Sequence, residues 1–148
     1  MKFLNFFKLL QNNQKVLKYN NLYMDIAKRC AKMSHAKRRQ VGAIIVKNGQ
    51  IISMGWNGTP RNFDNTCEEN GITKEIVLHA ESNAITKLTK STETGDGSTL
   101  YITLSPCIHC AKLIIQSGIS EVIYLEKYKD SSGIELIKQS NINIKELK

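Results

Sequence analysis

Apolar and polar positions along this chain of 148 residues alternate between a helical period and a strand period. Apolar residues that recur every three or four positions predict four helices, over 21–34, 75–90, 106–117 and 131–139. Short β-branched or alternating runs predict five strands, over 41–46, 50–54, 99–104, 121–125 and 142–147. The predicted order is helix, strand, strand, then helix and strand in turn three times, with no internal repeat.

The connections between these elements predict how the strands pair. Asn48-Gly49 is a strong tight-turn pair, so the first two strands should form an antiparallel hairpin. The last three strands are joined through helices and should lie parallel by right-handed crossovers. We therefore expect an α/β fold with a mixed five-stranded sheet and helices on both faces. Ligands of such sheets bind at the carboxyl ends of strands, where the helix starts near His79 and Cys107 are expected.

Two segments fall outside this regular pattern. Residues 57–72 hold Asn, Gly, Pro and Asp without periodicity and are expected to form a long loop, which in a compact domain is often functional. The start of the chain resembles a signal peptide, but Asn5 and Lys8 interrupt its apolar stretch. Residues 1–19 are therefore expected to be a short amphipathic helix or a loosely ordered extension. The remaining residues, 20–148, are the right length for a single domain.

Composition indicates which partners and which cellular compartment to expect. The formal charge of +8 favours anionic partners without saying whether they are nucleic acid, nucleotides or lipids. No apolar run approaches the roughly 18 residues of a membrane span, so we expect no membrane partner. Cys107 and Cys110 are spaced for metal or redox chemistry rather than for a structural disulfide. A cytoplasmic protein with reduced thiols is the expectation.

Four residues carry the candidate chemistry. His79, Cys107 and Cys110 would supply three zinc ligands and leave a fourth position open, as in catalytic rather than structural zinc sites. A helix N-terminus and a metal both favour the thiolate form of cysteine that zinc requires. Glu81, two residues after His79, is placed to take a proton from a zinc-activated water and deliver it to a leaving group.

Each part of this set also has an ordinary structural explanation. A Cys-x-x-Cys pair can be a redox pair, a single histidine is often a surface residue, and a glutamate early in a helix complements the helix dipole. The sequence places His109 on the helix face away from the two cysteines. Cys30 falls on an apolar helix face and is expected in the core, whereas Cys67 is expected to be a free thiol in a loop.

Together, His79-Ala80-Glu81 and Pro106-Cys107-Ile108-His109-Cys110 match the H-x-E and P-C-x-x-C signature of zinc deaminases. From about residue 22 to 147 the chain resembles the cytidine deaminase superfamily. The resemblance implies a three-layer α/β/α cytidine deaminase-like fold with one catalytic zinc ion. It also implies that zinc-bound hydroxide attacks the amine-bearing ring carbon, C4 of cytosine, while Glu81 shuttles protons and ammonia leaves.

Within that superfamily the chain is most similar to the deoxycytidylate (dCMP) deaminase family. The similar blocks are Val41-Gly42-Ala43-Ile44-Ile45-Val46, Gly55-Trp56-Asn57-Gly58-Thr59-Pro60, His79 to Ile85, Tyr101 to Lys112 and Gln116-Ser117-Gly118-Ile119. The resemblance implies hydrolysis of dCMP to dUMP for thymidylate synthesis. It implies that Asn57 binds the sugar, that Ala80 and the Ser105 region contact the cytosine, and that Tyr128 lines the pocket.

The phosphate site is less specified by the sequence. Lys37-Arg38-Arg39 lies in a predicted loop. Arg38 is the candidate for binding the 5′-phosphate, because an arginine can bind two phosphate oxygens at once. Ser34 matches a family serine and is expected to assist. The alternative is that these cations form a solvated charged turn.

Members of the family are often hexamers that dCTP with Mg²⁺ activates and dTTP inhibits, which implies a homo-oligomer here. The chain departs from the family pattern at Arg61-Asn62 and carries only Cys67 in the region where some relatives bind a second zinc ion, so one ion is expected. The alternatives are a tRNA adenosine or other nucleic-acid deaminase, which would explain the basic charge, and a non-catalytic zinc-stabilised binding module. Neither nucleic acid nor a membrane is the preferred partner.

Overall fold

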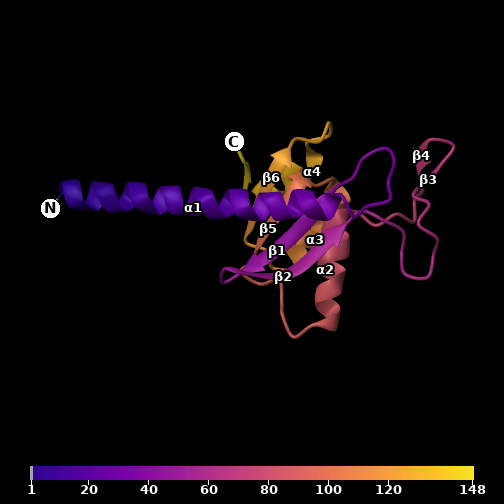
Figure 1. The fold of residues 1–148 in the computed structure, drawn as a ribbon, viewed down its shortest axis with the longest axis horizontal. Coiled ribbons are helices and arrows are strands. Elements are labelled where there is room, and N and C mark those ends of the chain that lie inside the picture. The colour runs from indigo at the N-terminus through magenta and orange to yellow at the C-terminus, as the bar shows by residue number, and fades with distance from the viewer. Residues whose placement is uncertain (1) are drawn as a thin grey trace.

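The computed structural model describes residues 2–148 and has a mixed five-stranded sheet at its centre (Figure 1). The strands are β1 (Gly42–Lys47), β2 (Gln50–Trp56), β5 (Thr99–Leu104), β6 (Glu121–Glu126) and β7 (Asn143–Glu146), in the order β2-β1-β5-β6-β7. β1 pairs antiparallel with both β2 and β5, whereas β5, β6 and β7 are parallel. The predicted α/β fold, the hairpin and the three parallel strands are confirmed.

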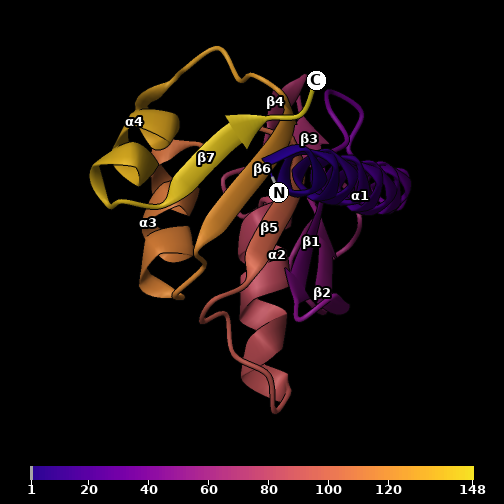
Figure 2. The ribbon, with the colours of Figure 1, turned by 90° about the vertical axis from the view of Figure 1, so that its left-hand side faces the viewer.

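Helices cover both faces of this sheet (Figure 2). One face packs against α1 (Lys2–Ala31), with Met24 and Ala27 set against Ile44. The other face packs against α2 (Ala80–Lys87), α3 (Ile108–Gln116) and α4 (Ser132–Gln139), which share a larger apolar core with Ile45. Because both faces are covered, the continuous apolar run of β1 is explained: successive side chains enter different cores.

Two glycines let helices lie directly on the sheet. A Cβ added at Gly55 of β2 would stand 2.3 Å from the Ala80 carbonyl oxygen of α2. A Cβ at Gly42 of β1 would stand 2.0 Å from the Ala27 carbonyl oxygen of α1, on the opposite face. Gly55 therefore fixes how closely the first turn of α2 approaches the sheet.

The first helix is longer than the sequence indicated. α1 runs without interruption from Lys2 to Ala31, so residue 19 lies inside one helix. Only its C-terminal part packs on the sheet, and the remainder projects from the domain (Figure 1). The projecting part exposes apolar side chains such as Phe3, which is 81% exposed. No helix of the described residues has the length and apolarity of a bilayer-spanning segment.

Three other boundaries correct the sequence expectations. The helix predicted over 75–90 begins only at Ala80 and ends at Lys87, followed by a 3-10 turn over Leu88–Lys90. Leu78 instead forms an isolated β-bridge with Gly58, and this pairing keeps the residues before His79 out of the helix. Similarly, the helix predicted from Pro106 begins at Ile108, and Cys107 is its N-cap.

The segment expected to be an irregular loop contains a small hairpin. β3 (Glu68–Glu69) and β4 (Ile72–Thr73) pair antiparallel, and Gly71 occupies the turn with a φ of +75°. The buried thiol side chain of Cys67 packs with Ala36 and Val77 beneath the hairpin. The expected loop is therefore tethered to the segment that precedes β1.

Candidate metal centre and active site

The N-termini of α2 and α3 bring three candidate metal ligands together. His79 is the N-cap residue of α2, Cys107 is the N-cap residue of α3, and Cys110 lies one turn into α3. His79 Nδ1 is 3.5 Å from Cys107 Sγ and 3.4 Å from Cys110 Sγ, and the ligand atoms all lie within 4.8 Å of one another. The predicted set thus forms one cluster, although Cys107 caps its helix rather than lying within the first turn.

The two thiols of this cluster are inequivalent. A hydrogen bond from the Cys110 thiol is the largest of several effects that lower the pKa of Cys107 to about 3. The same hydrogen bond, together with burial, raises the pKa of Cys110. The hydrogen bond to Cys107 also raises the pKa of His79 above its ordinary value. Cys107 is therefore the more acidic of the two thiols, and a bound cation would favour loss of the remaining protons.

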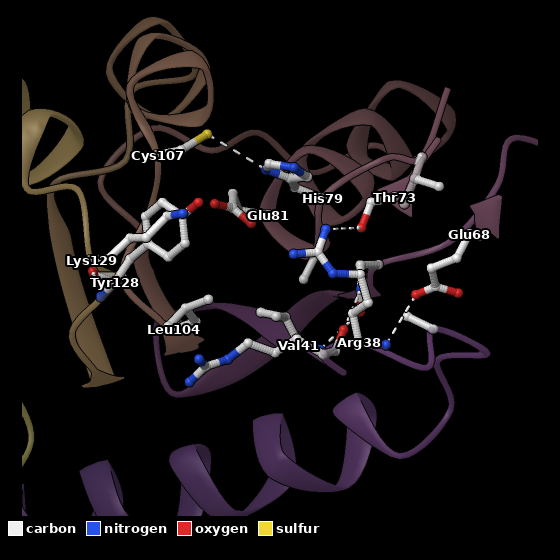
Figure 3. A pocket seen from close by; sticks show the side chains of 16 residues that line it. Arg38, Val41, Glu68, Thr73, His79, Glu81, Leu104, Cys107, Tyr128 and Lys129 are labelled. Atoms are coloured by element: carbon white, nitrogen blue, oxygen red, sulfur yellow. Dashed lines mark hydrogen bonds between the residues drawn. The ribbon is translucent and has the colours of Figure 1, made fainter. Parts of the chain in front are cut away.

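Glu81 lies in the first turn of α2 beside the cluster. Its side chain is 3% exposed, and burial raises the pKa of its carboxyl group above the ordinary value. A glutamate with a raised pKa can accept a proton and release it near neutral pH, which is what a proton shuttle requires. Figure 3 shows the carboxylate directed into the space between His79 and Tyr128.

A cavity of about 390 Å³ opens in front of these residues (Figure 3). Its floor is formed by His79, Ala80, Glu81 and Cys107. Its walls come from the segment before β1, the residues that directly follow β2 and β5, the hairpin β3–β4 and the loop after β6. The wall residues discussed below are Arg38, Arg39, Asn57, Glu68, Thr73, Ser105, Tyr128 and Lys129. The candidate metal centre therefore lies at the base of a cavity whose other walls carry three cations.

The two polar residues expected near the sugar and phosphate both hold the segment before β1. The Asn57 side chain accepts a hydrogen bond from the Val41 backbone N–H at 2.8 Å and donates one to the Arg39 carbonyl oxygen at 2.8 Å. The Ser34 hydroxyl donates to the Asn57 carbonyl oxygen and accepts from the Ala36 N–H. Asn57 lines the cavity, whereas Ser34 is buried and is not among its lining residues.

The remaining predicted substrate residues all line the cavity. Ala80 is fully buried in the cavity floor. The Ser105 hydroxyl accepts a hydrogen bond from the Tyr128 backbone N–H at 2.8 Å, so it orients the loop that carries Tyr128. Arg38 is exposed, and its guanidinium donates to the Thr73 hydroxyl at 3.4 Å while turned into the cavity (Figure 3).

The sequence prediction includes Arg39 only as part of the basic stretch 37–39, and it misses three other polar residues of the cavity wall. Arg39 forms an ion pair with Glu126, and Lys129 follows Tyr128 in the loop after β6. Glu68 and Thr73 come from the hairpin β3–β4, whose two-residue strands are too short to show a strand period. Lys129 could have been noticed because it directly follows Tyr128 in the sequence, but nothing marked the hairpin residues.

The other cysteines lie away from the metal cluster. Cys30 is buried in the core under α1, as expected. Cys67 is a free thiol in a loop, as expected, and its side chain is buried. His109 is exposed and is not part of the cluster found among residues 2–148.

Comparisons with known proteins identify the family of this chain. A family model described as the cytidine and deoxycytidylate deaminase zinc-binding region matches residues 17–126. Human deoxycytidylate deaminase is 39% identical over 125 residues, which cover 78% of this chain and 69% of that protein. The deoxycytidylate deaminase of Saccharomyces cerevisiae is 31% identical over 140 residues, which cover 86% of this chain. This chain spans only 44% of that yeast relative.

A solved structure shares most of the fold. The crystal structure of dCMP deaminase from the cyanophage S-TIM5, in complex with dCMP and dUMP, superposes with a TM-score of 0.83 at 44% sequence identity. The match covers 85% of this chain and 94% of the phage chain. This chain therefore shares its fold with a deaminase whose structure holds dCMP and dUMP.

Proposed function

The chain belongs to the family of cytidine and deoxycytidylate deaminases, and we propose that it converts dCMP to dUMP by zinc-dependent hydrolysis, with release of ammonia. The observation that carries this proposal is the His79, Cys107 and Cys110 cluster beside the buried carboxyl group of Glu81 at the base of the cavity. A binding module stabilised by zinc would not need a buried acid there, nor a cavity that reaches the metal centre.

The donor set of the cluster fits zinc. Two thiolates and one imidazole nitrogen are ligands that Zn²⁺ prefers, and three protein ligands leave one coordination position for a reacting molecule. Zinc bound there would supply Lewis acidity that makes a water molecule reactive near neutral pH. Glu81 would accept the proton of that water and pass it to the departing amine, which leaves as ammonia. Burial of Glu81 supports this role because it raises the pKa of the carboxyl group above its ordinary value, which favours acceptance of a proton.

The cavity walls suit a nucleoside monophosphate. Three cations, Arg38, Arg39 and Lys129, line the cavity, and we assign the 5′-phosphate to Arg38. The cytosine would lie over Ala80, with backbone acceptors near Ser105 facing its amine and Tyr128 packed against its ring. Asn57 would contact the sugar through the part of its side-chain amide that is not used by its two hydrogen bonds to the backbone. Ser34 would act on the phosphate only through the turn that it holds.

Other features follow from family membership as parts of the same proposal. We propose a homo-oligomer, of hexameric type, whose activity responds to dCTP with Mg²⁺ and to dTTP. Residues 20–148 would form the deaminase domain, and the cytoplasm would be its location. The sedimentation mass tests the oligomeric state, and the rate of dCMP deamination with dCTP and Mg²⁺ or with dTTP tests the response to effectors.

A substrate panel tests the proposed reaction. Ammonia release and the ultraviolet change of deamination would be followed with dCMP, CMP, deoxycytidine, dCTP and a tRNA anticodon stem. We expect the highest kcat/KM with dCMP. Activity confined to the tRNA would replace the proposal by a nucleic-acid deaminase, and zinc-loaded protein that acts on none of these would favour a binding module.

A further inference from the structure

We propose that Glu68 is a positioning residue for the substrate phosphate, because its carboxylate holds the turn that presents Arg38 to the cavity. This inference rests on the proposed function, since it assumes that Arg38 binds the 5′-phosphate. Glu68 itself would touch no substrate atom. Its role would be to fix the backbone from which the Arg38 side chain extends.

The geometry at the turn is specific. A single oxygen of Glu68, Oε1, accepts hydrogen bonds from two successive backbone N–H groups, those of Lys37 at 2.9 Å and Arg38 at 3.1 Å. Successive N–H groups that converge in this way form a concave anion site, and here a carboxylate of the same chain occupies it (Figure 3). Hydrogen bonds to an ionised acceptor are stronger than neutral ones, so this contact restrains both residues of the turn.

The same hairpin holds the Arg38 side chain. Glu68 on β3 pairs directly with Thr73 on β4, and the Thr73 hydroxyl accepts a hydrogen bond from Arg38 Nη1 at 3.4 Å. One pair of cross-strand neighbours therefore contacts the turn twice, once at the backbone and once at the guanidinium. Together they restrict the directions in which this exposed arginine can point.

The hairpin is itself anchored close to the turn. Cys67, the residue before Glu68, is buried against Ala36, the residue before Lys37. The Lys74 N–H donates to the Cys67 carbonyl oxygen at 2.9 Å and closes the base of the hairpin. This anchor places Glu68 opposite the turn and makes the hairpin a rigid support rather than a free loop.

A carboxylate in a cavity for a phosphate group has an opposing effect, because like charges repel. If repulsion dominated, removing the charge would improve binding of a phosphorylated substrate whatever replaced it. If positioning dominates, the acceptor atom matters more than the charge. Glu68→Gln keeps a side-chain oxygen that can accept both N–H groups, whereas Glu68→Ala removes it, so the two substitutions separate these effects.

The test compares dCMP with deoxycytidine, which lacks the phosphate. In Glu68→Ala we expect roughly a tenfold rise in the KM for dCMP, and a kcat/KM for deoxycytidine within about twofold of the wild type. In Glu68→Gln the KM for dCMP should stay within about threefold of the wild type. Thr73→Val should raise the KM for dCMP in the same direction but by less. Glu69→Ala, the neighbouring exposed residue of the same strand, is the matched control and should change neither value.

The outcomes separate this inference from its premise. A wild type and an Arg38→Ala variant that handle dCMP equally well would overturn both the phosphate assignment and the role of Glu68. Loss of dCMP preference in Arg38→Ala but not in Glu68→Ala would overturn the role of Glu68 alone. A lower KM for dCMP in both Glu68 variants would show repulsion instead of positioning. A fall in the melting temperature with an unchanged ratio of the two substrates would show a structural contact only.

Discussion

Replacing Gly55 by alanine is expected to move the catalytic end of α2. The new methyl group would stand 2.3 Å from the Ala80 carbonyl oxygen and 2.6 Å from the Ala84 backbone nitrogen, whereas ordinary contacts begin near 3.4 Å. Restoring ordinary contact requires α2 to move away from the sheet by about 1 Å. His79 and Glu81 both lie at the start of that helix, so the displacement separates them from Cys107 and Cys110 on α3.

Two magnitudes follow from this displacement. Overpacking of a core by a methyl group costs about 1–3 kcal/mol, which lowers the melting temperature of a chain of this size by roughly 2–4 °C per kcal/mol. A misplacement of about 1 Å in catalytic groups can lower kcat on the order of 100-fold. Thermal unfolding of the zinc-loaded protein and steady-state deamination of dCMP measure the two effects, and a chelator competition assay measures zinc affinity.

Gly42→Ala provides the matched control. Its methyl group would crowd the Ala27 carbonyl oxygen of α1 on the opposite face of the sheet, at 2.0 Å, so it should destabilise the fold to a similar extent. Because α1 carries none of the four central residues, kcat and zinc affinity should fall much less in Gly42→Ala than in Gly55→Ala. Equal losses of kcat in two variants of equal stability would show that Gly55 does not set the position of α2.

Two further predictions concern the turn and the metal ligands. Asn57→Ala removes two hydrogen bonds of 2.8 Å between this side chain and the backbone. It should lower the free energy of unfolding by about 1–3 kcal/mol and raise the KM for dCMP. An unchanged unfolding midpoint in urea would contradict the structural role of this side chain. Zinc affinity should fall as the pH is lowered from 8 to 6, by about tenfold per pH unit for each proton that zinc displaces. The reason is that zinc binds neutral His79 and ionised thiols, whereas the pKa values of His79 and Cys110 are both raised, so protons compete with the metal. Chelator competition at several pH values measures this slope, and an affinity that does not change with pH would show that these groups are not the ligands.

The sheet could be predicted from the sequence because its signals are local. Asn48-Gly49 specifies a tight hairpin turn, and the strands that follow alternate with helical segments long enough for parallel crossovers. The metal cluster could be predicted for a related reason. His79, Cys107 and Cys110 lie at or near the N-termini of two helices that meet at one edge of the sheet. Short motifs at the ends of helices and strands therefore indicate both the strand pairing and the metal ligands.

The rest depended on contacts between distant segments. The bridge of Leu78 to Gly58 delays the start of α2, and no pattern within 75–79 reveals it. The hairpin that carries Glu68 has strands of two residues each, which are too short to show a strand period. Asn57 was expected to contact substrate, but only the fold shows that both ends of its amide already bind the backbone.

The most direct test of the account measures dCMP deamination by zinc-loaded wild-type protein and by Glu81→Gln. Glutamine keeps the size of the buried side chain but cannot carry a proton between the attacking water and the leaving amine. We predict that wild-type protein forms dUMP and ammonia in equal amounts, and that Glu81→Gln binds the same amount of zinc but has a kcat lower by about 10²- to 10⁴-fold. Wild-type protein that leaves dCMP unchanged, or a Glu81→Gln variant as active as the wild type, would contradict it.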